Sequence, residues 1–299
     1  MISPKISRKL YRLAMPALKL SRSAPASEQP VFVIGSGRSG NTLVRRVLLA
    51  SEQIYVPPET YVLGDVIEGW QRSAALPWRQ RVWLFCAFFE RHPHWNTFGL
   101  ESLTAFAREA EGLRVKSLPA LIDAFFRYLA REAGSDAPRW GDKTPWNTFH
   151  LPAIGRTFPQ ARYLWLVRDG RDVALSYVKA GLYPEIGAAA DRWAQANRSC
   201  AQFARWIPHL RCIRYEDVAE NPEATFRGVF DWLGLDFEPG MLTGKPARMG
   251  DVEMLSHHAA VASAINGRSV GKWRSEIDGA ALARLPQDFH AWAGRLGYS

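Results

Sequence analysis

A glycine-rich turn at residues 35–42 is the clearest place in this sequence for binding an anionic ligand. It reads Gly-Ser-Gly-Arg-Ser-Gly-Asn-Thr and follows a short apolar run at 31–34, which predicts a buried strand. Residues 42–50 predict a helix directly after it. Glycines let backbone N–H groups approach an anion, and the N-terminus of a helix adds partial positive charge. We therefore expect a negatively charged group to bind at this turn.

Two nucleotide-binding patterns fit the turn in part. Gly35, Gly37 and Gly40 match the G-x-G-x-x-G fingerprint of dinucleotide-binding folds, which expects an acidic residue about 20 positions later. Glu59 stands near that distance, but it follows two prolines rather than a strand. The turn also nearly spells the NTPase P-loop, G-x-x-x-x-G-K-S/T, with Asn41 where the phosphate-binding lysine is required. Without that lysine, hydrolysis of ATP or GTP loses a main electrostatic element.

A second cationic segment follows another predicted strand, at 163–167. It begins with Arg168, and an arginine at a strand end can form a bidentate pair with phosphate. Ser176 lies about two turns into the helix predicted after it, where its hydroxyl could face the same group. The alternative is a surface ion pair between Arg168 and Asp169 or Asp172.

Together, these two segments resemble the sulfotransferases that use 3′-phosphoadenosine-5′-phosphosulfate (PAPS). In that family a lysine or arginine precedes Ser-Gly-Thr-Thr in the loop for the 5′-phosphosulfate, and residues 38–42 match this string except at Asn41. The resemblance implies that Arg168 and Ser176 bind the 3′-phosphate of PAPS. It also implies that the glycine-rich loop binds this donor through Gly37, Arg38, Ser39, Gly40, Asn41 and Thr42.

Two further segments extend the resemblance toward the C-terminus. Tyr215 ends a predicted strand at 211–215, and the family places such a tyrosine near the adenine nucleotide. Residues 266–274 are similar to the family's closing R-x-G-x-x-G-x-W-K segment, which implies 3′-phosphate contacts for Arg268, Gly271 and Lys272. This segment lacks one of the usual glycines, and its alternative is a basic surface loop. The resemblance covers residues 31–63, 139–180, 211–237 and 265–274, in the family's order.

Sulfuryl transfer needs a base for the acceptor proton and cations near the charge that develops on the leaving phosphate. By resemblance to the tyrosylprotein sulfotransferases, Glu59 is the general base, and Lys143 acts beside Arg38 on the transferred group. One alternative is that Glu59 stabilises the start of a helix at Thr60. The other is that Lys143 is a turn residue paired with Asp142.

Strands alternate with helices along the chain, which predicts an α/β fold with a mainly parallel sheet. The resemblance implies the P-loop type of this class, a three-layer α/β/α arrangement. Residues 65–138 are helix-like and aromatic, and we expect them to form a helical insert on the acceptor side. Residues 1–30 are expected to form a basic tail and linker, and 31–299 a single domain. The strands are expected at 31–34, 54–56, 163–167 and 211–215. Besides the helix at 42–50, one helix is expected after the third strand, ending at Lys179, and two more at 189–207 and 223–233.

The composition limits the partners of the chain. Six of the 38 basic residues lie within residues 1–27, which contain no acidic residue, so 32 basic residues face 29 acidic ones in the remainder. This near balance argues against a nucleic-acid surface. The tail is either a solvated extension or an amphipathic helix in peripheral contact with a membrane, through Ile2, Ile6, Leu10 and Leu13.

Metal and disulfide chemistry are not expected. The 3 cysteines lack disulfide or zinc spacing, which favours a reducing, cytoplasmic compartment. The histidine pairs at 92/94 and 257/258 lack accompanying acids at ligand spacing.

The acceptor is not readable from the sequence. A carbohydrate, a lipid-linked or a phenolic hydroxyl, and an amine all remain open. Two other functions stay open as well. A P-loop nucleotide kinase would bind ATP with Mg²⁺, and a non-catalytic scaffold of the same fold would bind the nucleotide but tolerate loss of Glu59.

Overall fold

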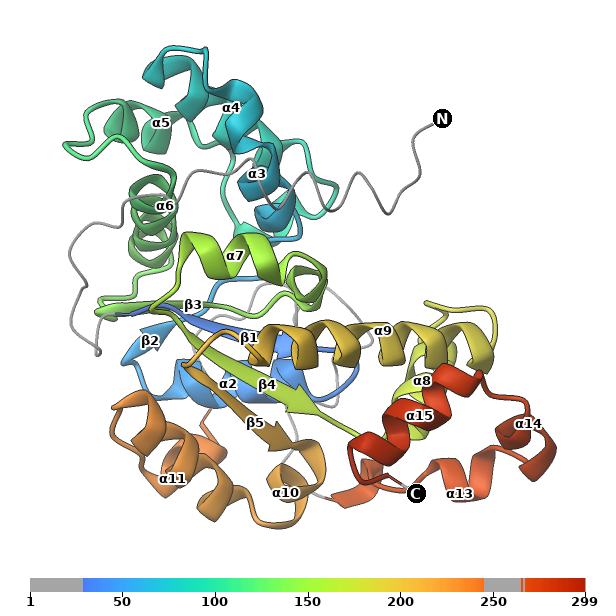
Figure 1. Ribbon diagram of the computed structural model, residues 1–299. Coiled ribbons are helices and arrows are strands. Elements are labelled where there is room, and N and C mark those ends of the chain that lie inside the picture. Colours follow the sequence, from blue (N-terminus) through green and yellow to red (C-terminus); the bar gives the residue numbers. More distant parts are fainter. Residues whose placement is uncertain (1–28, 245–264, 266, 299) are drawn as a thin grey trace, which may run out of the picture.

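The computed structural model describes residues 29–244, 265 and 267–298, and its centre is a sheet of five parallel strands in the order β2-β3-β1-β4-β5 (Figure 1). The predicted α/β class with a parallel sheet is confirmed. The strands are β1 (Val31–Gly35), β2 (Ile54–Tyr55), β3 (Arg139–Asp142), β4 (Arg162–Val167) and β5 (Leu210–Arg214).

The helices between the strands cover both faces of the sheet. Those before β3 are α2 (Asn41–Ala50), α3 (Leu63–Gly69), α4 (Trp78–Glu90), α5 (Thr104–Glu111) and α6 (Leu118–Glu132). Those between β3 and the end of β5 are the 3-10 helix η4 (Pro145–Phe149), α7 (Leu151–Thr157), α8 (Gly170–Lys179) and α9 (Ile186–Ala204). After β5 come α10 (Tyr215–Glu220), α11 (Pro222–Leu233), η5 (Pro239–Leu242), η7 (Gly267–Ser269), α13 (Trp273–Glu276), α14 (Gly279–Ala283) and α15 (Gln287–Arg295). Two more 3-10 helices, η2 (Trp70–Ser73) and η3 (Trp95–Phe98), flank α4.

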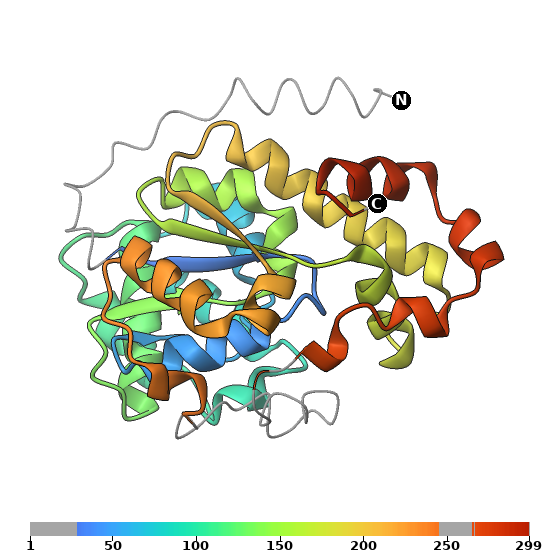
Figure 2. The same ribbon diagram turned by 90° about the horizontal axis from the view of Figure 1, so that it is seen from below.

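Alternate residues of β1 belong to two different apolar cores. Phe32 and Ile34 pack with residues of α3 to α9 and α15, whereas Val31 and Val33 pack with residues of α2, α10 and α11. This follows from the two-residue repeat of a strand, which sends successive side chains to opposite faces. Figures 1 and 2 show α7 and α9 over one face and α2 and α11 over the other, so the molecule has three layers.

The strand β3 is absent from the sequence-based prediction. Its sequence, Arg-Trp-Gly-Asp, has one large apolar residue and no alternation, yet all four residues are buried between β1 and β2. Arg139 is held there because its Nη1 donates to the carbonyl of Leu233 at 2.8 Å and its Nε to that of Gln29. Trp140 packs its indole flat on Phe126, with ring centroids 4.1 Å apart. Tertiary contacts rather than local preference therefore make this segment a strand.

Among the described residues, no helix combines the length and apolar character needed to cross a bilayer. The tail that we expect to contact a membrane lies outside the described residues, so both that contact and the cytoplasmic location stay predictions.

Replacement of Trp140 by alanine should lower the free energy of unfolding by about 3–5 kcal/mol, because the indole is 1% exposed and fills the space between β3 and α6. Trp83, which is 38% exposed, is the matched control, and its replacement by alanine should cost about 1 kcal/mol or less. Urea unfolding followed by circular dichroism measures both. Equal losses for the two variants would contradict this account of β3.

Candidate functional site

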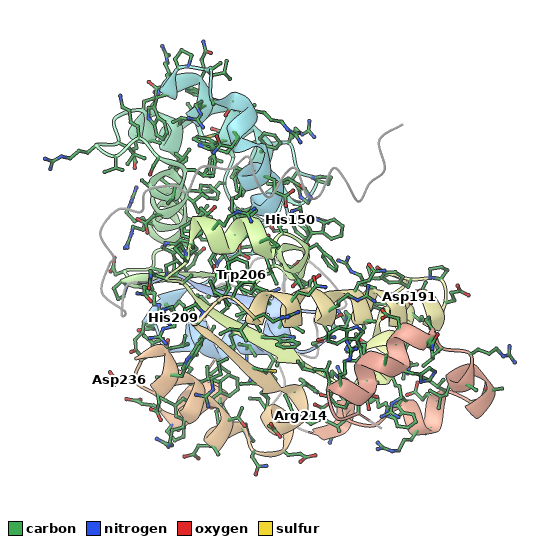
Figure 3. The ribbon with its side chains drawn as sticks, viewed as in Figure 1. His150, Asp191, Trp206, His209, Arg214 and Asp236 are labelled. Atoms are coloured by element: carbon green, nitrogen blue, oxygen red, sulfur yellow. The ribbon has the colours of Figure 1, made fainter. Side chains whose placement is uncertain are left out.

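The four segments singled out in the sequence meet at one edge of the sheet. Because β3, β1, β4 and β5 are adjacent and parallel, their carboxyl ends all lie at the same edge, where ligands of open α/β sheets bind. Lys143, Arg168 and Tyr215 directly follow the ends of β3, β4 and β5, and Arg38 lies in the loop that follows β1. Figure 3 marks the two ends of β5, with Arg214 on the site side and His209 at the opposite end.

The loop from β1 to α2 needs glycine at two positions. Gly40 has a φ of 95°, and a Cβ there would lie 2.5 Å from the ring of Tyr215. A Cβ at Gly37 would lie 2.5 Å from the hydroxyl oxygen of Tyr177. Gly40 is the N-cap of α2, and no side chain caps this helix, which leaves its first N–H groups pointing into the site. The loop is thus narrow, close to two tyrosines, and open to an anion at the end of α2.

Buried donors in and beside this loop suit a phosphate or sulfate group. Ser39 Oγ and Arg168 Nε are both buried without a hydrogen-bond partner in the described chain. A group with acceptor oxygens would satisfy such donors, whose burial without a partner is costly. Asn41, the departure from the family string, donates its Nδ2 to the carbonyl of Ser36 at 2.9 Å and so closes the loop on itself.

The two cationic segments come together around Arg38. Arg168 Nη1 donates to the backbone carbonyl of Arg38 at 3.0 Å, and Arg38 Nε donates to Ser176 Oγ at 3.1 Å. Burial lowers the pKa of Arg38, Tyr177 raises it, and the charge of Arg168 lowers it again, but an arginine stays protonated at neutral pH. The structure therefore brings Arg38, Arg168 and Ser176 to one place.

The alternative for Arg168, an ion pair with Asp169 or Asp172, is wrong. Asp169 pairs with Arg171 at 2.8 Å, and Asp172 accepts backbone N–H groups. Arg168 is 7% exposed, and its guanidinium lies over the ring of Tyr215, with 4.4 Å between the guanidinium carbon and the ring centroid. Tyr215 begins α10 rather than ending β5, a one-residue correction to the predicted strand.

The C-terminal segment docks on the first turn of α8. The two carboxylate oxygens of Asp172 accept the N–H groups of Gly271 at 2.7 Å and of Trp273 at 3.0 Å. Arg168 Nη2 donates to the carbonyl of Ser269 at 2.5 Å. The segment is thus fixed beside Arg168 rather than being a detached surface loop, and the side chains of Arg268 and Lys272 are exposed on it.

Glu59 and Lys143 form a salt bridge. Lys143 Nζ lies 2.6 Å from Glu59 Oε1, and the lysine side chain is fully buried while 15% of the glutamate side chain is exposed. Residues 56–62 form no helix, and α3 begins at Leu63, so the idea that Glu59 starts a helix at Thr60 is wrong. Asp142, the other expected partner of Lys143, accepts hydrogen bonds from Thr60 and Asn147.

Sequence reasoning missed several residues of the site. Tyr177, on α8, is 7% exposed with its hydroxyl 3.5 Å from Ser36 Oγ, and in the sequence it looks like any core tyrosine of a helix. Thr148 Oγ1 donates to the carbonyl of Gly35 at 2.9 Å and accepts its N–H at 3.0 Å. Tyr61 has a φ of 49°, which is unusual for a residue with a side chain. No local signal in the sequence marks these three positions.

The histidine pair at 92/94 lies against Tyr61. The rings of Tyr61 and His92 are stacked, with centroids 4.6 Å apart, and the ring of His94 lies 5.0 Å from that of Tyr61. Within the described residues, no group of three or more His, Cys, Asp or Glu side chains is placed to hold a metal ion. The pair and Tyr61 thus form an aromatic wall, and Tyr61 follows Glu59 by two positions in the chain.

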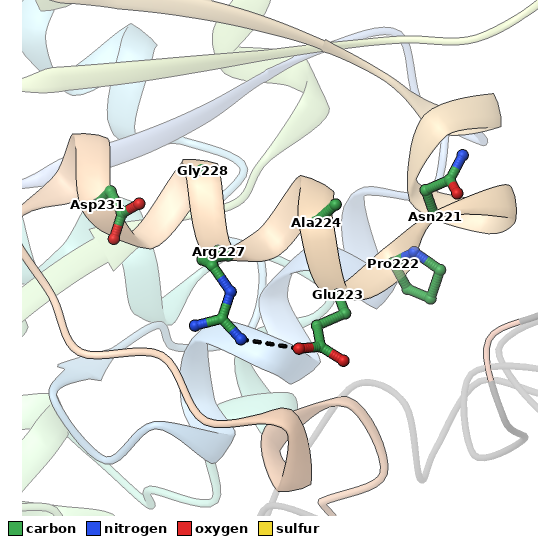
Figure 4. A pocket seen from close by; sticks show the side chains of 7 residues that line it. All are labelled: Asn221, Pro222, Glu223, Ala224, Arg227, Gly228 and Asp231. Carbon is green, nitrogen blue, oxygen red and sulfur yellow. Dashed lines mark hydrogen bonds and ion pairs between the residues drawn. The ribbon is translucent and has the colours of Figure 1, made fainter.

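Other features of the surface lie outside this site. Figure 4 shows a shallow hollow along α11, where Glu223 and Arg227 pair at 2.7 Å and so satisfy each other. His150, labelled in Figure 3, has its Nδ1 3.0 Å from Glu68 Oε1. In the part of the chain that the structure describes, neither the hollow along α11 nor the surroundings of His150 contain buried donors without a partner, such as those at the glycine-rich loop.

Comparison with known proteins places the chain in a family. Residues 30–239 match the model described as the sulfotransferase family. Protein-tyrosine sulfotransferase 2 of Gallus gallus is 24% identical over 289 residues, which cover 91% of this chain and 70% of that protein.

Two solved structures share the fold. The sulfotransferase domain of the Synechococcus PCC 7002 olefin synthase has a TM-score of 0.62 at 22% identity, covering 94% of this chain and 99% of that one. The sulfotransferase domain from the curacin biosynthetic pathway has a TM-score of 0.59 at 22% identity, covering 91% and 98%. The resemblance to sulfotransferases drawn from the sequence is confirmed.

Replacement of Gly40 by alanine should lower the free energy of unfolding by about 1–3 kcal/mol, because the Cβ combines an unfavourable φ with contact on Tyr215. Gly187 is the matched control, since nothing lies within 4 Å of its added Cβ and its φ is not in the left-handed region. Its alanine variant should change stability by less than about 1 kcal/mol. Urea unfolding measures both, and an equally stable Gly40 variant would contradict the geometry of the loop.

Proposed function

Because the chain belongs to the sulfotransferase family, we propose that it transfers a sulfuryl group from PAPS to an acceptor hydroxyl, with Glu59 as the general base. The observation that carries this proposal is the salt bridge between Glu59 and the buried Lys143, at the same sheet edge as Arg38 and Arg168. A base and cations gathered at one edge can supply the proton transfer and the charge stabilisation that sulfuryl transfer needs.

The donor fits the residues present. When bound, PAPS supplies an electrophilic sulfur and a phosphate leaving group. The 5′-phosphosulfate would be held by the glycine-rich loop, where Ser39 Oγ is a buried donor in need of a partner. The 3′-phosphate would be held by Arg168 and Ser176, with Arg268 and Lys272 exposed nearby on the docked C-terminal segment. Tyr215, packed beneath Arg168, would border the adenine side.

Glu59 and Lys143 have complementary tasks in this proposal. The carboxylate of Glu59 accepts the proton of the acceptor hydroxyl, a role that a positioned carboxylate performs when it lies within hydrogen-bond reach of that proton. Lys143 keeps the carboxylate in place before the acceptor binds, since their atoms are 2.6 Å apart. Lys143 and Arg38 also stabilise negative charge on the transferred group and on the leaving oxygen.

We propose a phenolic hydroxyl as the acceptor. The Gallus gallus relative is named a protein-tyrosine sulfotransferase, and a tyrosine side chain is a phenol. The wall formed by Tyr61, His92 and His94 includes the residue two positions after Glu59 in the chain, and it supplies aromatic surface for the ring of a phenol. A carbohydrate or lipid-linked hydroxyl is the competing outcome of an acceptor screen.

Thermal-shift titration with 3′-phosphoadenosine 5′-phosphate (PAP), ATP with Mg²⁺, and NAD tests the donor. PAP should stabilise selectively, because two anion-binding places match its two phosphates, and saturation should raise Tm by roughly 5 °C or more. Stabilisation by ATP–Mg²⁺ alone would favour a nucleotide kinase, and stabilisation by NAD alone would favour a dinucleotide enzyme. Either result would overturn PAPS as the donor.

Replacement of Glu59 by glutamine should reduce kcat by about 10²–10⁴-fold, because the amide cannot accept the acceptor proton. PAP binding should be unchanged, since Glu59 is assigned no donor contact. Glu223→Gln, on the outer side of α11, is the control and should keep full activity. Radiolabelled PAPS with a tyrosine-containing peptide and with a simple phenol provides the assay. A fully active Glu59→Gln enzyme would exclude Glu59 as the base, and a protein that binds PAP without turning over any acceptor would be a scaffold.

A further inference from the structure

The two short segments that carry the Glu59–Lys143 salt bridge are also joined by hydrogen bonds between their neighbouring residues. One holds Glu59 and Thr60, and the other holds Asp142, Lys143 and Thr144. Thr60 Oγ1 donates to Asp142 Oδ2 at 2.6 Å, and the Thr60 N–H donates to Thr144 Oγ1 at 2.8 Å. Thr60, next to Glu59, is therefore hydrogen-bonded to Asp142 and Thr144, the two residues on either side of Lys143.

Asp142 is the centre of this arrangement. It is 1% exposed and receives hydrogen bonds from Thr60 and, at 3.0 Å, from Asn147 Nδ2. A buried carboxylate is costly even with the favourable charge of Lys143 acting on it, and packing alone would be served as well by an apolar side chain. We therefore look for the role of Asp142 in the hydrogen bond that it accepts from Thr60.

We propose that Asp142 is a positioning residue that acts through Thr60 to hold the carboxylate of Glu59 against Lys143. This inference rests on the proposed function, in which Glu59 is the base. Thr60 is bound through both its hydroxyl and its N–H, so its backbone is fixed, and Glu59 directly precedes it. The orientation of the base is thus set from the side of Thr60, which is 2% exposed.

The protonation state of Asp142 determines how the positioning of Glu59 depends on pH. Burial raises its pKa to about 6, opposed by the hydroxyls of Thr60 and Thr144, while Glu59 raises it and Lys143 lowers it. The ionised carboxylate accepts the Thr60 proton, whereas the protonated acid offers one acceptor fewer. The positioning effect is therefore present above about pH 6 and is lost as the pH falls below it.

Four variants of the chain test the inference: Thr60→Val, Thr60→Ser, Asp142→Asn and the double variant T60V/D142N. Thr60→Val keeps the shape but loses the hydroxyl, and kcat should fall about 10–100-fold with little change in acceptor KM or PAP affinity. Thr60→Ser keeps the hydroxyl and should remain within about threefold of wild type. The double variant should be no slower than the slower single variant, because both changes remove one interaction.

The pH profile separates positioning from a merely structural role. The ratio of the wild-type kcat to the Asp142→Asn kcat should decrease as the pH is lowered from about 8 to about 5. At the lower pH the wild-type Asp142 is protonated, and it loses the contact with Thr60 that the variant already lacks. Asparagine at this position would turn an amide donor toward one of the surrounding donors. A ratio that stays constant with pH would contradict the inference.

A measurement without donor or acceptor completes the test. A crystal structure of the free Thr60→Val protein should show the Lys143 Nζ–Glu59 Oε1 distance beyond the 2.6 Å of the present structure, with the strands unchanged. An intact salt bridge together with wild-type kcat in Thr60→Val would overturn the role of Asp142. That failure is distinct from failure of the proposed function, because Glu59→Gln would still lose turnover in the first case and would keep it in the second.

Discussion

The hydrogen bond from Arg168 to the backbone carbonyl of Arg38 joins two loops that lie 130 residues apart in the chain. It places two positive side chains at the ends of neighbouring parallel strands, where their repulsion must be offset. Ser176 accepts from one guanidinium and the ring of Tyr215 lies against the other. Backbone carbonyls of Arg38 and Ser269 accept from Arg168 as well, and an anion bound here would add acceptors for the remaining buried donors. The rest of the fold positions these loops.

The features that could be predicted from the sequence are those with local causes. Apolar runs at 31–34 and 163–167 mark strands because they are buried on both faces, and the glycines of the first loop mark a backbone that needs to approach an anion. The family resemblance was carried by residues next to these strands. Gly234, with a φ of 71°, ends α11 as its sequence indicates.

What the sequence could not reveal depends on contacts between distant segments. The strand β3 has a sequence without strand character, and it is a strand because Arg139 and Trp140 find partners in other elements. Tyr177 reads as a core residue, yet its hydroxyl meets the glycine-rich loop. The salt bridge of Glu59 joins residues 84 positions apart, so the lysine could be proposed only by resemblance, and its burial not at all.

Asp172 draws the C-terminal segment onto α8 through the N–H groups of Gly271 and Trp273, and this has a consequence for how the protein is made. The ribosome synthesises those residues after every strand of the sheet, since β5 ends at Arg214. A nascent chain therefore contains all five strands and the glycine-rich loop before the segment beside Arg168 has been synthesised. The binding surface is thus completed by residues that leave the ribosome after the strands that support it.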